Sequence, residues 1–378
     1  MSETNATPGV RGLETLLDDR MVSLESPQTQ QITRVAVNNL FQFLAENNVV
    51  DRVQDVDEQD ARDWAVNLQQ RDEIEGKNEL AANSIRTYFA LARATFGWWQ
   101  RSGEIDQNPL ATTTAEEPLP SKSNDVDQQF WTADARERLL AYVDERAHAA
   151  LEDDASDAPS AFRDRSLVYI LADTGVRGAE VCSVSRDDRR NGLRWEDVDL
   201  EKGMMTVLGK SGDQEAVSLP GVTAEKLARY RRLIDAPDEW PVIPTGDAAS
   251  KYGAVRDELA DRGYGDEEIE GVLEDCEIDE VLREYEVAPP ALTTEGARTL
   301  LQRLCEEADV DMDGDYLKPH GGRRGLGDEL YGEVAAESAQ EVLRHKSIET
   351  THASYRDRHP EDLAKDIEKV RYSSTDEE

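Results

Sequence analysis

The sequence predicts a mainly α-helical protein with a small antiparallel β-sheet, divided into two domains. Its 378 residues are enough for two domains with ordinary cores. Apolar residues recur at helical spacing along much of the chain, whereas residues 193–220 consist of short β-rich runs separated by glycine-containing turns. Residues 111–126 are rich in Thr, Ser and Pro and lack apolar periodicity, which is typical of a linker.

These boundaries divide the chain into a few predicted parts. They are an N-terminal tail (1–25), a helical domain (26–110), a linker (111–126), a second domain (127–371) that contains an acidic insertion (246–289), and an acidic C-terminal tail (372–378).

Three helices are predicted in the first domain, over residues 25–48, 58–71 and 83–103. Ser26 as N-cap and Pro27 at the first helical position mark the start of the first helix. Each helix has one apolar stripe, and the stripes contain Ile32, Ala36, Leu40, Phe43 and Leu44; Ala61, Trp64, Ala65 and Leu68; and Ile85, Phe89, Ala92, Phe96 and Trp99.

A neighbouring stripe of the third helix contains Arg86, Arg93 and Arg101. On their own, such arginines indicate a solvated helix face. They become candidates for contacts with a DNA backbone if the rest of the chain handles nucleic acid.

The second domain is predicted to be mixed. A helix over residues 132–151 opens it, the sheet follows at 193–220, and helices return from Thr293 onward. One long helix is expected over residues 328–345, with a buried stripe of Leu330, Val334, Ala335, Ala339, Val342 and Leu343. A last helix, over residues 359–372, is expected either to dock on a neighbouring subunit or to pack within its own chain.

The composition is strongly acidic. Asp and Glu number 81 against 43 Lys and Arg, which gives a net charge of −38, and the basic residues are 33 Arg and 10 Lys. This balance is typical of a protein from a high-salt cytoplasm, where salt screens self-repulsion. The alternatives are an acidic protein of ordinary salt or one with acidic disordered tails.

Cysteine usage and hydropathy indicate a cytoplasmic protein. Cys182, Cys276 and Cys305 are widely spaced and form no CxxC pair, so neither a disulfide framework nor a zinc site is expected. No apolar run is long enough to cross a membrane, and the N-terminus has no signal-peptide pattern.

Charge is distributed unevenly. Residues 233–289 hold 18 acidic and 4 basic residues, whereas residues 317–359 hold seven of each, together with four of the five histidines. The neutral segment is therefore the part of this acidic chain best suited to hold an anion.

Five motifs contain residues suited to phosphate chemistry. They are TGVRGAE with Arg177, VLGKSGDQEAV with Lys210, KPHGGRRG with His320 and Arg323, LRHKS with His345, and THASY with Tyr355.

Together, and in this order, the motifs resemble the tyrosine recombinase (phage-integrase-like) family. Its catalytic set is Arg, Lys, His-x-x-Arg, His or Trp, and a nucleophilic Tyr. The resemblance covers roughly residues 160–360 and, more loosely, extends back to about residue 26 through the helices and GEIDQNPL. It implies a SAM-like helical core-binding domain followed by a mixed α+β catalytic domain.

The chemistry of these residue types agrees with that resemblance. Guanidiniums are permanently charged, bidentate donors, so Arg177 and Arg323 are suited to the nonbridging oxygens of a scissile phosphate. Tyr355 can attack the phosphorus to give a covalent phosphotyrosine, which conserves the bond energy for rejoining.

The remaining members of the set handle protons and hydrogen bonds. His320 can act as general base or phosphate ligand. Lys210, in a hairpin turn, can protonate the leaving 5′ oxygen, and His345 can donate a hydrogen bond to the phosphate. No metal or other cofactor is expected, because the sequence has no Walker loop and no cysteine cluster.

By resemblance, the chain is expected to be a site-specific recombinase or integrase that cuts and rejoins double-stranded DNA through a 3′-phosphotyrosine, as a homotetramer on two duplexes. The core-binding domain, with Arg86, Arg93 and Arg101, would contact the DNA. The absence of a separate arm-binding module favours Xer-type dimer resolution or a plasmid or viral integrase. The alternatives are a non-cleaving DNA-binding protein of the same fold and a metal-dependent hydrolase using His320 and His345.

Three departures from the family pattern stand close to the motifs. The interval from His345 to Tyr355 is one residue longer than usual. Arg344 replaces the glycine commonly found before that histidine, and Arg324 stands where many members have a second histidine.

Overall fold

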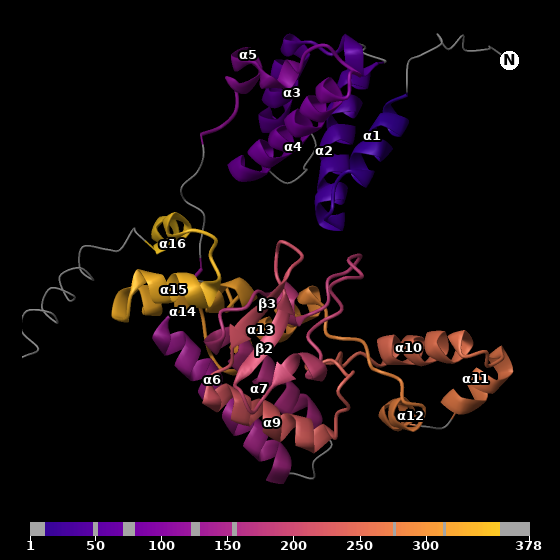
Figure 1. Ribbon diagram of the computed structural model, residues 1–378, viewed down its shortest axis with the longest axis vertical. Coiled ribbons are helices and arrows are strands. Elements are labelled where there is room, and N and C mark those ends of the chain that lie inside the picture. Colours follow the sequence, from indigo (N-terminus) through magenta and orange to yellow (C-terminus); the bar gives the residue numbers. More distant parts are fainter. Residues whose placement is uncertain are drawn as a thin grey trace, which may run out of the picture. The chain divides into compact units, whose positions relative to one another are not determined.

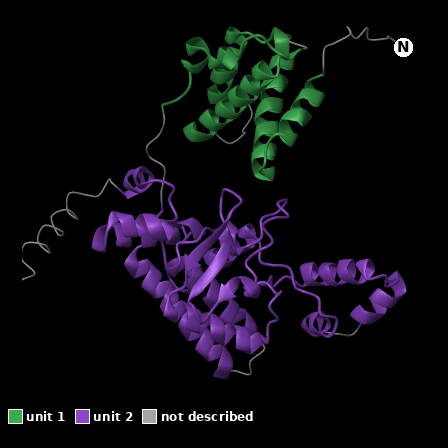
Figure 2. Cartoon of the chain, in the orientation of Figure 1, with its two compact units in different colours: residues 1–127 green, residues 128–378 purple. Residues whose placement is uncertain are grey.

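The computed structural model describes residues 12–47, 52–70, 80–121, 129–152, 157–274, 277–312 and 315–355. The chain forms two compact units, residues 1–127 and 128–378 (Figure 1, Figure 2). Helices dominate both units, and one three-stranded antiparallel sheet lies in the second. The predicted fold class is therefore confirmed.

The first unit is a bundle of amphipathic helices. Its elements are α1 (Leu13–Val22), α2 (Pro27–Glu46), η1 (Val53–Asp55), α3 (Glu58–Gln70), α4 (Ala82–Arg101), η2 (Pro109–Ala111) and α5 (Thr113–Glu116). The hydroxyl of Ser26 caps α2 by accepting from the Thr29 N–H at 3.4 Å. The predicted apolar stripe of α4 is fully buried against the other helices, because its residues recur once per turn.

Two elements of this unit lie where no structure was expected. Helix α1 falls within the predicted tail, yet Leu16, Leu17 and Met21 are buried in the bundle core. The indole N–H of Trp99 donates to the Leu16 carbonyl at 3.2 Å. Helix α5 falls within the predicted linker, and its Ala115 is buried in the same core. Residues 1–11 of the tail and 122–126 of the linker lie outside the described residues.

The second unit is built around α7 (Ala158–Asp173). From Phe162 to Ala172, all residues except Arg163 are buried, and α6, α9 and α14 pack against this helix. The other helices of the body are α6 (Ala133–Glu152), α8 (Gly178–Val181), η3 (Trp195–Asp197), α9 (Gly221–Ile234), α13 (Thr294–Glu307), α14 (Pro319–Glu333), α15 (Ala336–Leu343) and α16 (Ile348–Tyr355).

The sheet lies beside α8, with strands β1 (Val198–Asp199), β2 (Met204–Leu208) and β3 (Gln214–Ser218) in that order. Strands β2 and β3 form a hairpin in which Leu208 pairs with Gln214. Met205 and Val207 point into the core, as the period of two requires. The turn that joins β2 to β3 contains Lys210.

The long helix predicted over residues 328–345 is wrong, because the chain breaks between α14 and α15. Val334 leaves the helical conformation and is 67% exposed, although it was placed in the buried stripe. The break lets α15 fold back on α14, which brings Leu343 against Gly175 and Gly327. A continuous helix would carry Leu343 away from both contacts.

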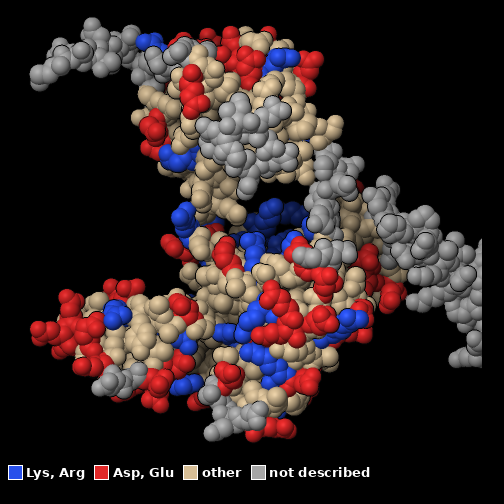
Figure 3. Space-filling model, turned by 180° about the vertical axis from the view of Figure 1, so that it is seen from behind, with Lys and Arg blue, Asp and Glu red and all other residues tan. Residues whose placement is uncertain are grey.

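The acidic insertion forms a small helical layer of its own. Helices α10 (Ala248–Asp261), α11 (Asp266–Leu273) and α12 (Ile278–Glu284) pack on one another and lie to one side of the body (Figure 1). Both ends are held together, since the Thr245 N–H donates to the Pro290 carbonyl at 2.8 Å and Pro244 bridges to Ala291. Figure 3 shows acidic side chains over this layer and basic ones gathered on the body.

Candidate active site

The first arginine motif begins where the central helix ends. After α7, the Thr174 hydroxyl donates to the Ile170 carbonyl at 2.7 Å, and Gly175 takes a positive φ of 65° that turns the chain. Arg177 then sits at the N-cap position of α8. Because α7 is buried along most of its length, Arg177 follows directly from a well-packed helix.

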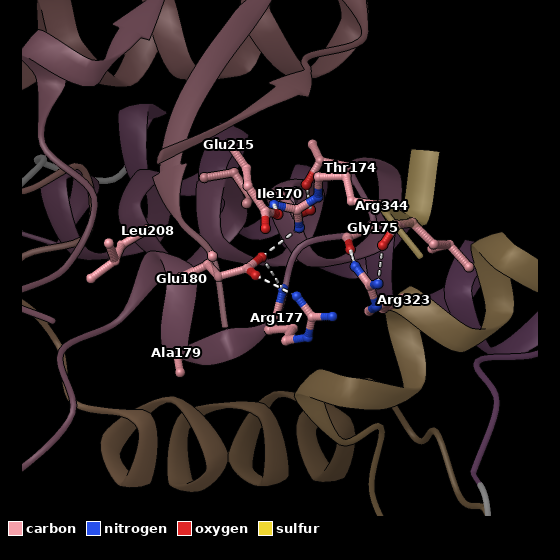
Figure 4. Close-up of polar contacts among 12 residues, drawn as sticks. Ile170, Thr174, Gly175, Arg177, Ala179, Glu180, Leu208, Glu215, Arg323 and Arg344 are labelled. Carbon is pink, nitrogen blue, oxygen red and sulfur yellow. Dashed lines mark hydrogen bonds and ion pairs between the residues drawn. The ribbon is translucent and has the colours of Figure 1, made fainter. Parts of the chain in front are cut away.

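A buried carboxylate orients this arginine. Glu180 accepts from the Arg177 backbone N–H at 2.9 Å and from its guanidinium at 2.7 Å. It also accepts from the Arg344 guanidinium at 2.6 Å (Figure 4). Burial alone would raise the pKa of Glu180, but these hydrogen bonds and the charge of Arg344 outweigh burial and hold it below its usual value. Glu180 is therefore a charged anchor between two guanidiniums.

The second arginine motif opens α14, with Pro319 in its first turn. This helix approaches α7 very closely, because a β-carbon at Gly322 would lie 2.4 Å from the Leu171 carbonyl oxygen. The indole N–H of Trp131 donates to the Lys318 carbonyl at 2.8 Å and fixes the start of the helix. His320 and Arg323 are therefore placed on the side of the unit where α7 ends.

Arg323 is nearly inaccessible, with 2% of the residue exposed. Its guanidinium donates to the carbonyls of Gly175 and Leu343, which joins the arginine turn to the end of α15 (Figure 4). Burial and the charge of Arg177 lower the pKa of Arg323 to about 10. The group stays charged at neutral pH, and its positive charge adds to that of Arg177 nearby.

His320 lies at the surface beside these arginines. Although the residue is exposed, desolvation of its ring is the largest cause that lowers its pKa, followed by the charges of Arg324, Arg323 and Arg177. Together they lower the pKa to about 4. The ring is therefore neutral at pH 7 and able to accept a proton.

His345 follows α15 and faces the same guanidiniums. Desolvation and the charges of Arg323 and Arg177 lower its pKa to about 4. Its Nδ1 lies 2.9 Å from the hydroxyl of the buried Thr351. When that hydroxyl donates to Nδ1, the proton of the neutral ring is on Nε2, which can then donate to an anion.

Tyr355 ends the described part of α16 and is buried, with 5% exposed. Its ring packs against Phe130 and Tyr331 at centroid distances of 6.2 and 5.9 Å, and its hydroxyl rests on Gly327 of α14. Burial raises the pKa of Tyr355 to about 12, although Arg323 and Arg324 pull it down. The phenol is therefore protonated at neutral pH, and it lies close enough to Arg323 to interact with its charge.

Lys210 is not brought into contact with the other candidates. It is exposed in the β2–β3 turn, and the described part of the chain gives it no hydrogen bond or ion pair. The base of its turn is nevertheless fixed, because Arg190 donates to the carbonyls of Leu208 and Gly209 at 2.8 and 2.7 Å.

The structure therefore gathers five of the six predicted residues and leaves Lys210 apart. Sequence reasoning missed the roles of Glu180, Arg344 and Thr351. Glu180 belongs to the quoted TGVRGAE motif and Arg344 stands next to His345, so both carried a positional signal. Nothing in the sequence indicated the contact between Thr351 and His345.

The arginines predicted to contact DNA lie in the first unit, and two of them have partners there. Arg86 donates to the Pro120 carbonyl at 2.6 Å, and Arg93 forms an ion pair with Glu116. Arg101 is exposed at the end of α4. On the same unit, α2 and α4 share a groove of about 480 Å³ lined by uncharged side chains, namely Gln28, Gln31, Ile32, Val35, Asn83, Ser84, Thr87 and Tyr88.

The described residues contain neither a membrane-spanning helix nor a metal-ligand cluster. In that part of the chain, no helix has the length and apolar character needed to span a membrane. Nor do three or more His, Cys, Asp or Glu side chains among those residues gather as metal ligands would. Cys182 and Cys305 are free and buried, and Cys276 lies outside the described ranges.

No family model matches the chain. Among curated proteins it is similar to the tyrosine recombinase XerC of Xanthomonas axonopodis pv. citri, with 28% identity over 207 residues, which cover 54% of this chain and 59% of the relative. A second XerC, from Chlorobaculum parvum, is 25% identical over 61% of this chain and 66% of its own. The matches span less than two thirds of the length of these relatives.

The fold is shared with solved structures. A lambda integrase dimer bound to a COC′ core site aligns over 93% of this chain and 97% of its own, with a TM-score of 0.57 and 15% identity. The XerH recombinase in a post-cleavage complex with a palindromic difH substrate aligns over 95% and 82%, with a TM-score of 0.58 and 14% identity.

Proposed function

We propose that the chain is a member of the tyrosine recombinase family, a site-specific recombinase that cuts and rejoins duplex DNA through a covalent 3′-phosphotyrosine. One observation supports this most strongly. Two guanidiniums, two neutral imidazoles and a buried phenol from four separate segments converge on one side of the second unit.

The arginines serve as the anion site. Arg177 is oriented by Glu180 and Arg323 by two main-chain carbonyls, so neither guanidinium has to reorganise when a phosphate arrives. Fixed charge of this kind stabilises a pentavalent phosphorane more than the ground-state diester, because charge on the nonbridging oxygens grows. No cofactor is required for the reaction.

The histidines and the lysine handle protons. His320, with a neutral ring, accepts the proton of the attacking phenol, and His345 donates through Nε2 to a nonbridging oxygen. Lys210 gives a proton to the leaving 5′ oxygen. It can reach that oxygen only when DNA lies against the hairpin turn, which agrees with its exposure in the free protein.

Tyr355 is the nucleophile, and its packing against α14 keeps its hydroxyl away from substrate in the free protein. Its hydroxyl lies on Gly327 rather than in open solvent. Attack therefore requires α16 to shift from α14, and binding of DNA or of a second copy would supply the free energy for that shift. The negative charge of the phosphate would also make His320 more basic, which helps it to accept the phenol proton.

The first unit contributes DNA contacts. The groove between α2 and α4 presents amide and hydroxyl groups such as Gln28, Gln31 and Asn83, which can bond to base edges or to sugar and phosphate oxygens. Arg86 and Arg93 can contact the DNA backbone once their partners Pro120 and Glu116 are exchanged for phosphates.

The active assembly would be a tetramer on two duplexes, acting through a Holliday junction in a high-salt cytoplasm. The helix predicted over residues 359–372, which lies outside the described residues, would dock on a neighbouring copy.

The test begins from the covalent intermediate. Wild-type protein is incubated with a pool of randomised duplexes, and DNA that stays attached after denaturation is recovered and sequenced. The enriched duplex is then given to Tyr355→Phe, a change that removes only the hydroxyl. We expect Tyr355→Phe to bind that duplex with wild-type affinity and to form no adduct.

The adduct should survive EDTA, since the proposed site needs no metal. If wild-type protein enriches no duplex, or if Tyr355→Phe still becomes attached, the proposal fails. Binding by both proteins without any adduct would instead identify a non-cleaving DNA-binding protein of the same fold.

A further inference from the structure

Arg344 has a backbone conformation that a long side chain seldom adopts. It follows α15 with φ 54° and ψ 45°, in the left-handed region. Glycine has no steric cost there, whereas a residue with a β-carbon does. An arginine held in this region indicates that its side chain has a use that outweighs the backbone cost.

The side chain makes two ion pairs with carboxylates from separate elements. Its Nη2 lies 2.6 Å from Glu180 of α8, and its Nη1 lies 2.9 Å from Glu215 on β3 (Figure 4). With 11% of the side chain exposed, this is a largely desolvated contact in which geometry matters. The pairs connect the segment that ends in Tyr355 to both the arginine turn and the sheet.

Through Glu215, Arg344 is connected to the β2–β3 turn that contains Lys210. The Glu215 carboxylate lies against Gly209, the residue before Lys210, since a β-carbon on Gly209 would fall 2.2 Å from Glu215 Oε1. The end of β2 is held separately, because the Arg190 guanidinium donates hydrogen bonds to the carbonyls of Leu208 and Gly209 and also to that of Ala179. Arg344 therefore completes a two-sided fixation of the hairpin at the point where Lys210 begins.

We propose that Arg344 is a positioning residue for Lys210, acting through Glu215 and Glu180. The inference rests on the proposed function. In that reaction a P–O bond forms to Tyr355, the P–O5′ bond breaks, and the bonding pair goes to O5′, which takes a proton from Lys210. Without Arg344, only the Arg190 hydrogen bonds still tie the turn to the arginine motif, so Lys210 is placed less firmly and protonation of O5′ slows.

Arginine is the residue type that can do this. Its planar fork reaches two carboxylates at once and stays charged when desolvated, whereas lysine offers one point charge. Removing it would also leave Glu180 and Glu215 without the charge that stands between them, so the hairpin would be pushed away from the arginine turn.

The leaving group offers a direct test. The duplex that wild-type protein cleaves is synthesised with its 5′-bridging oxygen replaced by sulfur, because a thiolate leaves without being protonated. Removal of a general acid lowers rates by roughly 10²–10⁴-fold on the oxygen substrate. We expect Arg344→Gly, which suits the left-handed backbone, to lose at least tenfold on oxygen by the same reasoning and less than threefold on sulfur.

Lys210→Ala should show the same pattern more strongly, and the double variant should be no slower than Lys210→Ala alone. The sulfur-to-oxygen ratio is taken within one variant, so a loss of folded protein cancels. Glu215→Gln, which keeps Arg344 in place, should raise the ratio as well. Arg256→Gln is the matched control, because Arg256 pairs with Glu270 on the exposed insertion, and it should leave the ratio unchanged.

If Arg344→Gly is slowed equally on oxygen and sulfur, Arg344 holds the phosphate or the fold and the inference is overturned. The same holds if the defects of Arg344→Gly and Lys210→Ala multiply. Failure of wild-type protein to form an adduct on either duplex would overturn the proposed function, and this inference with it.

Discussion

Two neutral histidines beside two arginines define the character of the site. Desolvation and the arginine charges lower the pKa of both His320 and His345 to about 4. The arginines therefore supply the positive charge, and both imidazoles are unprotonated at neutral pH. A site built from charged histidines would bind phosphate as well but could not take a proton from the phenol.

This arrangement predicts a pH effect on stability. The unfolded chain protonates His345 near pH 6.5, whereas the folded protein resists protonation until about pH 4. The neutral His345 ring therefore contributes to the free energy of unfolding above pH 6.5, and this contribution is lost as the pH falls toward 4. The melting temperature of wild type should therefore drop relative to that of His345→Asn when the pH is lowered through this window.

Thermal melts followed by circular dichroism at several pH values check this. A melting-temperature difference that does not change with pH would show that the His345 ring titrates normally in the folded state.

Sequence reasoning predicted the residue types of the site but not their surroundings. The order of the motifs predicts Arg177, Arg323 and Tyr355 as site residues, and the structure places these three side chains near one another. The carbonyl partners of Arg323 and the seat of Tyr355 come from contacts between segments 20 or more residues apart, which no local pattern encodes.

At the scale of elements, α14 is organised by its glycines. Gly322 and Gly327 allow two different neighbours, α7 and α16, to approach the helix more closely than any side chain permits. Glycine weakens an isolated helix, so its use here indicates that close packing is worth more than helix propensity.

Gly327→Ala should therefore displace the Tyr355 side chain from its buried position against α14. The new methyl would lie 2.2 Å from the tyrosine hydroxyl and 2.6 Å from Leu343 Cδ1. Such overpacking costs about 1–3 kcal/mol, against about 1 kcal/mol gained in helix propensity. We expect a lower urea midpoint and faster nitration of Tyr355.

Gly253→Ala is the matched control, since it lies in helix α10 with open space around it. It should be neutral or slightly stabilising by up to about 1 kcal/mol. Equal effects of the two substitutions would mean that Tyr355 does not rest on Gly327.

The sequence predicted those helices in which apolar residues recur regularly at helical spacing. The stripe from Ile85 to Trp99 is buried as expected, because a helix that packs on one side needs that spacing. Helix α1 was missed because acidic residues interrupt its leucines. The break at Val334 was missed because the stripe continues across it, and only the contacts of Leu343 with Gly175 and Gly327 require the turn.

On the scale of the whole chain, the net charge of −38 conflicts with a nucleic-acid partner. Figure 3 shows acidic side chains over the insertion. At the candidate site, Arg177, Arg323 and Arg344 lie near one another. The groove on the first unit is lined by uncharged amides and hydroxyls. Binding by hydrogen bonds at such a surface releases few counterions.

Binding to the enriched duplex should therefore depend only shallowly on salt. About six phosphate contacts would give a loss of roughly five decades in affinity per tenfold rise in salt. We expect a clearly smaller slope, measured by fluorescence anisotropy of a labelled duplex with Tyr355→Phe. A collapse of binding between moderate and molar salt would contradict adaptation to a high-salt cytoplasm.

The closed base of the insertion has a practical consequence. Thr245 and Pro290 are hydrogen-bonded neighbours, so the chain leaves the body and returns to it at a single point after about forty residues. Any module whose own ends lie close together can be spliced there without stretching the fold. The insertion is therefore a position at which a foreign domain with adjacent termini, such as a DNA-binding domain, could be fused into the second unit.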